Sequence, residues 1–326
     1  MALAFSLKKY WEWDFHTTFN SDHDFKNTRV IPNRSINGLA KKCTFGKMKI
    51  TKDKISRLIN EKVVRVGLTK GHNDYQKFVI FSNYRCGSNY LMNLLKSHSN
   101  VVCFSEVFYL DQIYWASKIY GGKVNDGRLM IERDKDERSF LENHIYRSYS
   151  KNIKAVGFKL HYKDMHRHEM RILKDYLTEH PETKVIHLKR NNHLDRYIST
   201  IITDKTNTAV MVDESSYKKK IENMGQLTLD PVICGKEFTW REGEHNTFEQ
   251  LLTDLNANVL KITYTDLTKE NKKTMDEVAK FLNLKPIELS TEQKKQNKKQ
   301  KKDIIANYAE LKTHFKDSEW SYLFNE

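Results

Sequence analysis

The chain has 326 residues, of which 39% are hydrophobic and 30% charged, and its formal net charge is +14 at pH 7. This length and composition indicate a soluble globular protein with a substantial core, in one large α/β domain or two smaller ones. The positive charge implies an anionic partner, but it does not choose among nucleic acid, an acidic membrane and a polyanionic nucleotide.

The four cysteines are scattered, with no C-x-x-C pair, and no histidine cluster has the spacing of a zinc site. We therefore expect neither a disulfide framework nor a metal, and a reducing compartment is favoured. The apolar run at the N-terminus is too short for a signal peptide, and no segment approaches the ~20 apolar residues that cross a bilayer. These features predict a cytoplasmic protein.

Residues 1–75 are polar and weakly periodic, with one plausible helix at Lys52–Glu61, and we interpret them as an N-terminal extension, either a cap or an oligomer contact. From residue 76 onward, short apolar runs alternate with helical patterns, which is typical of a mostly parallel sheet flanked by helices. The predicted strands are Phe78–Ser82, Val101–Ser105, Ala155–Leu160, Lys184–Leu188 and Val259–Tyr264. The predicted helices are Asn89–His98, Met165–Glu179, His193–Thr203, Thr247–Leu255 and Lys273–Leu282, and residues 121–140 and 205–245 are expected to form long loops or irregular helices.

The first strand leads into the sequence S-N-Y-R-C-G-S-N-Y-L, which predicts a tight turn and the start of a helix. A helix start carries unpaired N–H groups and the positive end of the helix dipole. Gly87 leaves room for a close phosphate, Arg85 adds a permanent charge, and Ser88 or Asn89 can cap the helix or donate to oxygens. The turn therefore predicts a phosphate site, and an ordinary polar turn of an α/β protein is the alternative.

A second stretch, Lys184 to Ser199, repeats this pattern of strand, arginine and helix. Arg190 follows the strand, and Arg196 lies one helical turn before Ser199. An arginine at a strand end and a serine on the next helix can hold one phosphate together, and an exposed basic loop is the alternative. Two such sites on one sheet suit a nucleoside with phosphates at both ends, which requires Arg85 and Arg190 to lie close together.

The segment Gln293–Lys302 carries six lysines in ten residues. A charge run of this kind is typical of a solvated helix face, and an anion-binding segment is the alternative. Lys298 and Lys299 are its candidate ligands. A final helix is expected to continue through Ile304 and Leu311.

With these two motifs in order, the chain resembles the sulfotransferases that use 3′-phosphoadenosine 5′-phosphosulfate (PAPS). Arg85 to Leu91 is similar to that family's 5′-phosphosulfate loop, often R-S-G-S-[TN]-x-L, and Arg190 to Ser199 resembles its 3′-phosphate site. The likeness covers roughly residues 77–315. Cys86 replaces the usual serine, and the spacing from Arg190 to Ser199 is one residue longer than in well-known cytosolic members, which leaves Arg196 as the alternative to Ser199.

The resemblance implies a P-loop-like α/β sulfotransferase domain over residues 76–326 that sulfates a hydroxyl or amine of a small metabolite or glycan without a metal. The implied nucleotide-binding residues are Arg85, Cys86, Gly87, Ser88, Asn89, Tyr90, Arg190, Ser199, Arg196, Lys298 and Lys299. Arg85 would also act in catalysis, by stabilising charge on the leaving phosphate. Glu106, at the end of the second strand, is the first choice for the base because some family members place a glutamate at this distance after the loop. His161 is the second choice, and the alternative for Glu106 is a salt bridge that orients Arg85.

Two other classes of function remain open at this stage. The net charge and the lysine run suit a basic nucleic-acid-binding protein, although no helix-turn-helix, zinc-finger or RNA-recognition signature supports it. A nucleoside or metabolite kinase on a related fold is less favoured because the G-x-x-x-x-G-K-[ST] motif is missing. For the sulfotransferase, we expect a small-molecule or glycan acceptor, no nucleic-acid or membrane partner, a homodimer as one option and secondary metabolism as one setting.

Overall fold

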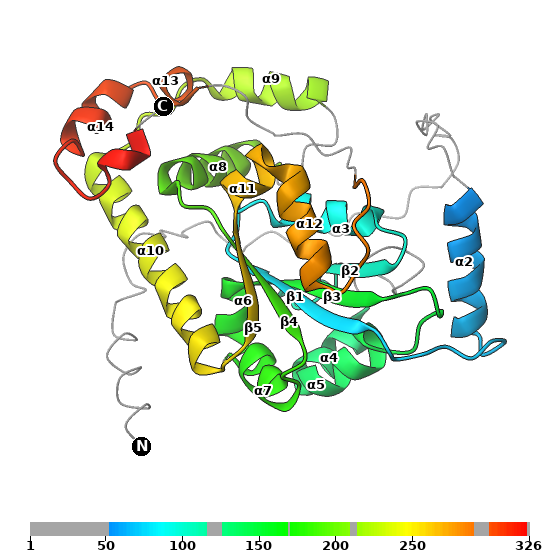
Figure 1. Cartoon of the computed structure of the whole chain (residues 1–326). Coiled ribbons are helices and arrows are strands. Elements are labelled where there is room, and N and C mark those ends of the chain that lie inside the picture. The colour runs from blue at the N-terminus through cyan, green and yellow to red at the C-terminus, as the bar shows by residue number, and fades with distance from the viewer. Residues whose placement is uncertain (1–51, 116–125, 169, 209–213, 290–299, 325–326) are drawn as a thin grey trace, which may run out of the picture. The chain divides into compact units, whose positions relative to one another are not determined.

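A five-stranded parallel sheet forms the centre of the computed structural model, which describes residues 52–115, 126–168, 170–208, 214–289 and 300–324 (Figure 1). The strands are β1 (Gln76–Ser82), β2 (Val101–Glu106), β3 (Ala155–His161), β4 (Lys184–Lys189) and β5 (Asn258–Thr263). Their order in the sheet is β2-β3-β1-β4-β5, and every neighbouring pair is parallel. The predicted α/β class and parallel sheet are therefore confirmed.

Helices cover both faces of the sheet because successive strand residues point to opposite sides. On β1, Val79 and Phe81 join one buried cluster, while Phe78 and Ile80 join another. The first cluster includes residues of α5 (Glu137–Phe140), the π-helix η1 (Leu141–Ile145), α6 (Tyr162–Arg167), α7 (Arg171–Glu179) and α10 (Pro231–Asp254). The second includes residues of α3 (Ser88–Ser97), α11 (Tyr264–Lys269) and α12 (Asn271–Phe281).

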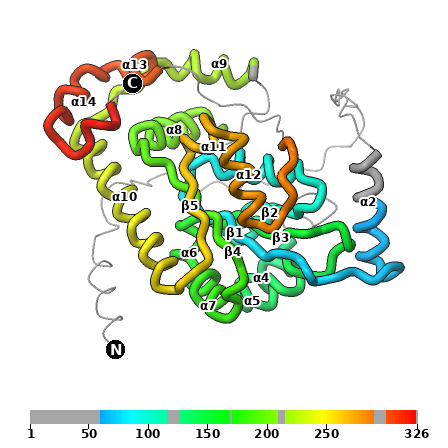
Figure 2. The backbone as a smooth tube through the Cα atoms, viewed as in Figure 1, coloured from blue at the N-terminus to red at the C-terminus, as the bar shows by residue number. Residues whose placement is uncertain are grey.

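A third buried cluster joins helices that are distant in the chain, and the backbones of these helices gather to one side of the sheet (Figure 2). It contains residues of α8 (His193–Thr206), α9 (Glu214–Met224), α13 (Lys301–Ile304), α14 (Tyr308–His314) and the 3-10 helix η2 (Ser321–Phe324), together with the first half of α10. The remaining described helices are α2 (Lys52–Arg65) and α4 (Gly127–Lys135). The C-terminal segment therefore packs on the helices that follow β4.

The prediction of one helix over Met165–Glu179 is wrong. The chain forms α6 and α7 instead, and between them Met170 has a φ of 62°, in the left-handed region. A left-handed residue cannot continue an α-helix, so the hydrophobic periodicity of this segment is divided between two helices.

Residues 205–245 are not a long loop throughout, because α10 runs for 24 residues through Pro231–Asp254. The Asp230 side chain accepts hydrogen bonds from the N–H groups of Val232 and Ile233, and Pro231 occupies the first helical position. This is a strong helix start, visible in the sequence as Asp-Pro. The predicted helix Thr247–Leu255 is only the last part of α10. The expected continuous final helix is likewise divided into α13 and α14.

Candidate active site

The loop between β1 and α3 has the shape of an anion cradle. Arg85 and Gly87 both have positive φ, 63° and 92°, so the chain turns sharply before α3 begins at Ser88. The Gly87 carbonyl accepts the N–H groups of Tyr90 and Leu91, which starts the helix. The N–H groups of the first helical turn have no partner inside the helix, so those of Ser88 and Asn89 are available to an anion.

Two arginines meet at this loop. The Arg85 Nε donates to the Ser199 Oγ on α8 at 2.9 Å, and the Arg190 Nη1 donates to the Arg85 carbonyl at 3.3 Å. The structure therefore brings together three residues that the sequence analysis assigned to opposite ends of one nucleotide. Burial lowers the pKa of Arg85, Tyr217 opposes this effect, and the positive charge of the nearby Arg190 lowers the pKa further.

Tyr264, at the start of α11, is a site residue that the sequence analysis did not single out. Its ring packs against Gly87, and the Arg190 guanidinium carbon lies 4.5 Å from the ring centre. The aromatic face therefore borders both the loop and the second arginine. The signal was its place at the end of the predicted strand Val259–Tyr264, but only the sheet order brings β5 next to β4.

The structure describes Arg196, one of the predicted nucleotide-binding residues, but not Lys298 and Lys299. The Arg196 Nε donates to the Tyr84 carbonyl at 3.0 Å, and its Nη2 lies 3.9 Å from Glu244. Arg196 thus holds the backbone of the loop, whereas Ser199 contacts Arg85 directly. The candidates Lys298 and Lys299 lie outside the described residues.

Glu106, Lys159 and His161 form one cluster at the ends of β2 and β3. The Glu106 Oε1 lies 2.6 Å from the Lys159 Nζ and 3.3 Å from the His161 Nε2. The Lys159 Nζ also donates to the Asn89 Oδ1, so this cluster is linked to the phosphosulfate-like loop. The ion pair of Glu106 is with Lys159, not with Arg85 as the alternative interpretation expected.

The Glu106 carboxylate is the member of this cluster that has an oxygen, Oε2, without a hydrogen bond to the described part of the chain. Within the described part of the chain, the hydrogen bonds and ion pairs of its carboxylate all use Oε1, and the side chain is 17% exposed. His161 is buried, and its Nδ1 lies 3.1 Å from the Ser82 carbonyl, so both of its nitrogens already face acceptors within the protein. Among the candidate bases, Glu106 is therefore the one with an oxygen left for an incoming hydroxyl.

The charge state of Glu106 follows from its neighbours. Burial raises the pKa of the carboxyl, but the hydrogen bond from His161 and the charge of Lys159 outweigh burial and lower the pKa to about 2. The carboxylate is therefore ionised at neutral pH. Asp164 in α6 shows the opposite behaviour, because burial raises its pKa to about 6 and its Oδ2 has no hydrogen-bond partner in the described part of the chain. Sequence reasoning missed Asp164, whose only signal was its place three residues after His161.

We expect Gly87→Ala to weaken binding of the nucleotide and to destabilise the protein. An added Cβ would lie 2.6 Å from the Tyr264 Cδ2, and a φ of 92° is strained for any side chain, a cost of about 1–2 kcal/mol. Thermal unfolding and nucleotide titration measure the two effects. Gly127→Ala, at an exposed helix start with open space around it, is the matched control and should leave both unchanged. Wild-type nucleotide affinity in Gly87→Ala would contradict the close approach at this glycine.

Arg133 fixes the loop that follows Glu106. Its side chain is fully buried, and its Nη1 donates to the carbonyls of Val107, Tyr109 and Gln112 at 3.1, 2.8 and 3.2 Å. Its Nη2 donates to the carbonyl of Leu110 at 3.3 Å. A single guanidinium therefore satisfies four carbonyls of residues 107–112, next to the proposed base.

We expect Arg133→Met to lower the free energy of unfolding by at least about 2 kcal/mol, because several buried carbonyls lose their donor. In the folded fraction, the KM for the acceptor should rise while the affinity for the nucleotide stays unchanged. Arg133→Lys should recover part of the acceptor KM, since it restores one donor group. Equal losses of acceptor and nucleotide binding would show that Arg133 acts on general stability alone.

Comparison with known proteins places the chain in a family. The sulfotransferase family profile matches residues 78–288, which include the loop, both arginines and the Glu106 cluster. The chain belongs to the sulfotransferase family. Among solved structures, it is similar to a sulfotransferase from Alicyclobacillus acidocaldarius, with 11% identity over 76% of this chain and 95% of that chain and a TM-score of 0.43. No curated protein matches it.

The described residues contain no group of three or more histidine, cysteine, aspartate or glutamate side chains arranged to hold a metal ion. They also contain no helix with the length and apolar character needed to span a membrane.

Proposed function

We propose that this protein transfers the sulfuryl group of PAPS to a hydroxyl or amine of a small metabolite or glycan and releases adenosine 3′,5′-bisphosphate. The main support for this proposal is that Arg85, Arg190 and Ser199 contact one another at one loop. The Arg85 Nε donates to the Ser199 Oγ at 2.9 Å, and the Arg190 Nη1 donates to the Arg85 carbonyl. Two repelling guanidinium groups at a helix start favour a bound anion. The buried Arg190 Nε also lacks a hydrogen-bond partner in the described part of the chain, as expected of a group that meets a ligand.

The residues present fit a nucleoside with phosphates at both ends. The N–H groups of Ser88 and Asn89 and the Arg85 guanidinium would hold the 5′ end, and Arg190 with Ser199 would hold the 3′ phosphate. The Tyr264 ring contacts both Gly87 and the Arg190 guanidinium, so it would lie beside a nucleotide held by these two groups of ligands. Cys86 contributes no hydroxyl, so its part in the loop would be its backbone.

Bound PAPS would supply an electrophilic sulfur and a phosphate leaving group. In the proposed reaction, the acceptor oxygen forms a bond to sulfur as the bond between sulfur and the phosphate oxygen breaks, and the acceptor proton passes to the Glu106 Oε2. Lys159 holds the Glu106 Oε1 and the Asn89 side chain, so it keeps the base next to the loop. Arg85 and the helix N–H groups would stabilise the negative charge on the departing phosphate.

Calorimetric titration with adenosine 3′,5′-bisphosphate tests the donor assignment, and transfer from labelled PAPS to a panel of hydroxyl and amine acceptors tests the reaction. We expect binding with a stoichiometry of one and labelled product with at least one acceptor. Absence of nucleotide binding would refute the donor assignment. Magnesium-dependent ATP turnover would instead favour a kinase, and duplex binding that excess nucleotide does not compete would favour a nucleic-acid-binding protein.

A further inference from the structure

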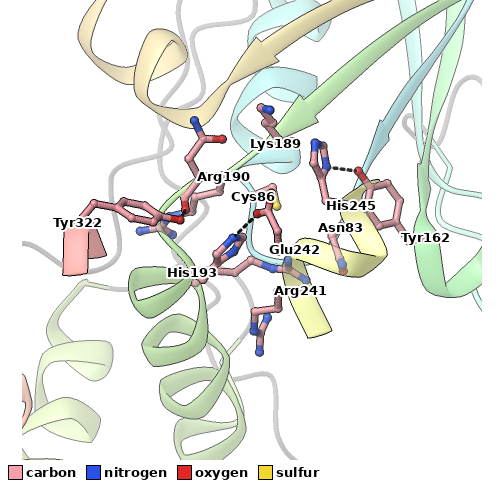
Figure 3. Close-up of a pocket in the computed structure, with 12 residues that line it drawn as sticks. Asn83, Cys86, Tyr162, Lys189, Arg190, His193, Arg241, Glu242, His245 and Tyr322 are labelled. Atoms are coloured by element: carbon pink, nitrogen blue, oxygen red, sulfur yellow. Dashed lines mark hydrogen bonds and ion pairs between the residues drawn. The ribbon is translucent and has the colours of Figure 1, made fainter. Parts of the chain in front are cut away.

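A cavity of about 270 Å³ lies beside the phosphosulfate-like loop and shares Cys86 and Arg190 with the proposed donor site (Figure 3). Asn83 and Cys86 of the loop line one wall. The other walls come from the end of β4, the start of α8, the middle of α10, Tyr162 and Tyr322. Arg85, Ser199 and Tyr264 are not among the lining residues, so most of the cavity wall is separate from the proposed nucleotide ligands.

The size of this cavity suits part of a ligand. Pockets that enclose a whole drug-sized molecule measure roughly 300–1,000 Å³. A cavity of about 270 Å³ is below that range, so it has room for a substituent, not for an entire nucleotide. Its occupant should therefore be one end of a larger molecule.

The wall that faces this cavity is cationic. Four basic side chains line it, against one carboxylate, Glu242; they are Lys189, Arg190, Arg196 and Arg241. The Glu242 Oε2 is taken by the His193 Nε2 at 2.7 Å. The acids that pair with the three arginines, Asp195, Glu244 and Glu237, are not among the lining residues. The three guanidinium groups are thus compensated by acids outside the cavity lining, and only Glu242 adds negative charge to the wall itself.

An unsatisfied buried atom marks the same wall. His193 lines the cavity and is only 3% exposed, yet its Nδ1 has no hydrogen-bond partner in the described part of the chain. Leaving a buried polar atom unpaired costs about 1–3 kcal/mol, and such atoms are rare in folded proteins. Because Nε2 donates to Glu242, the Nδ1 of the neutral ring is an acceptor, and a hydroxyl group of a ligand in the cavity would supply the missing donor.

The cavity also adjoins the reacting groups. Asn83 precedes Tyr84, whose ring centre lies 4.2 Å from that of His161, and Arg196 binds the Tyr84 carbonyl. A group held in the cavity is therefore anchored next to the segment that joins the donor loop to the base cluster. That position suits the acceptor, because the proposed ligands of the donor other than Arg190 and Cys86 lie outside the cavity lining.

We propose that this cavity binds an anionic substituent of the acceptor, a carboxylate, phosphate or sulfate, so that the acceptor is an acidic metabolite or acidic saccharide. This inference rests on the proposed sulfotransferase function. The donor nucleotide is the competing source of an anion, and saturating the protein with adenosine 3′,5′-bisphosphate separates the two. The cavity can then be examined by binding alone, without turnover.

Inorganic phosphate titrated calorimetrically into protein saturated with adenosine 3′,5′-bisphosphate is expected to bind. Arg241→Gln should weaken this binding at least about tenfold, the loss of one charge-assisted hydrogen bond. If Arg241→Gln does not fold, Lys189→Gln replaces it. Lys236→Gln makes the same charge change on the exposed side of α10 and should have no effect. No binding, or binding unaffected by the Arg241 and Lys189 changes, would overturn the proposal.

Displacement then identifies the source of the anion. The carboxylate of p-nitrophenyl β-D-glucuronide should displace the phosphate, and its neutral methyl ester should not. Phosphate should also inhibit sulfation competitively against the best acceptor of the panel. If phosphate binds only in the absence of nucleotide, the cavity belongs to the donor and the inference is overturned. Equal displacement of phosphate by the acid and by its methyl ester, or no displacement by the acid, would also overturn the inference. If the protein binds no nucleotide but does bind phosphate in this cavity, the proposed function is refuted while the anion site in the cavity stands.

Discussion

Glu106→Gln is expected to reduce kcat by ~10²–10⁴, the usual contribution of a positioned base, while the affinity for adenosine 3′,5′-bisphosphate stays within about twofold. The carboxylate Oε2 is the open atom of the Glu106–Lys159–His161 cluster, and an amide cannot take up the acceptor proton. Steady-state kinetics and calorimetry on the same preparation measure both quantities. Near-full activity in this variant would assign proton transfer to another group, with His161 and Asp164 as the next residues to test.

Glu106→Gln also leaves the Lys159 ammonium without its carboxylate partner, and Lys159 is only 1% exposed. This buried, unpaired charge needs a control of its own. The double variant Glu106→Gln/Lys159→Met removes both charges. If the fall in kcat comes from the lost base, the double variant should remain as slow as Glu106→Gln. If the fall comes from the unpaired Lys159 ammonium, the kcat of the double variant should recover. Thermal unfolding of the three proteins separates instability from lost chemistry.

Lys159→Met alone reports on the pKa of Glu106 in the same series. The charge of Lys159 is one of the effects that hold this pKa near 2 against the burial that raises it. Without it, the folded-state pKa of Glu106 should rise, so the carboxylate would become protonated at a higher pH. The acid limb of kcat/KM should then move to higher pH than in the wild-type protein, and an unmoved limb would argue against Glu106 as the base.

Arg85→Ala is expected to weaken binding of adenosine 3′,5′-bisphosphate roughly 10- to 100-fold, the loss of charge-assisted hydrogen bonds worth about 1.5–3 kcal/mol. Arg85 contacts Ser199 directly, and its carbonyl holds Arg190, so its removal disturbs both proposed phosphate ends. kcat should fall as well, because the same guanidinium would face the leaving phosphate.

Calorimetry with two further variants sharpens the Arg85 test. Arg85→Lys keeps the charge but loses the planar set of donors, so it should bind with intermediate affinity. Arg138→Ala removes an arginine whose side chain is 58% exposed on α5, and it should bind the nucleotide as the wild type does. Unchanged nucleotide affinity in Arg85→Ala would show that the loop does not receive the donor.

Much of the fold could be predicted from short segments. The buried run of β1 and the turn from Arg85 to Gly87 are encoded by neighbouring residues, and the structure places both within one or two residues of the prediction. The part of helix α10 before Thr247 was missed because it has no clear apolar stripe, although Asp230 and Pro231 marked its start. The break at Met170 was missed because a left-handed residue that is not glycine leaves no mark in a periodicity pattern.

The amino-acid order alone determined the class of fold, the anion-binding turn and the two arginines, because strand periodicity and turn chemistry depend on residues a few positions apart. Only the tertiary structure decided how these parts meet. An irregularity in the pairing of β2 with β3 sets Glu106 opposite Lys159, and Arg85 reaches Ser199 across 114 positions of sequence. Such contacts depend on strand order and register, which no local pattern specifies, and the cationic cavity between β4, α8 and α10 exists only once those elements have packed.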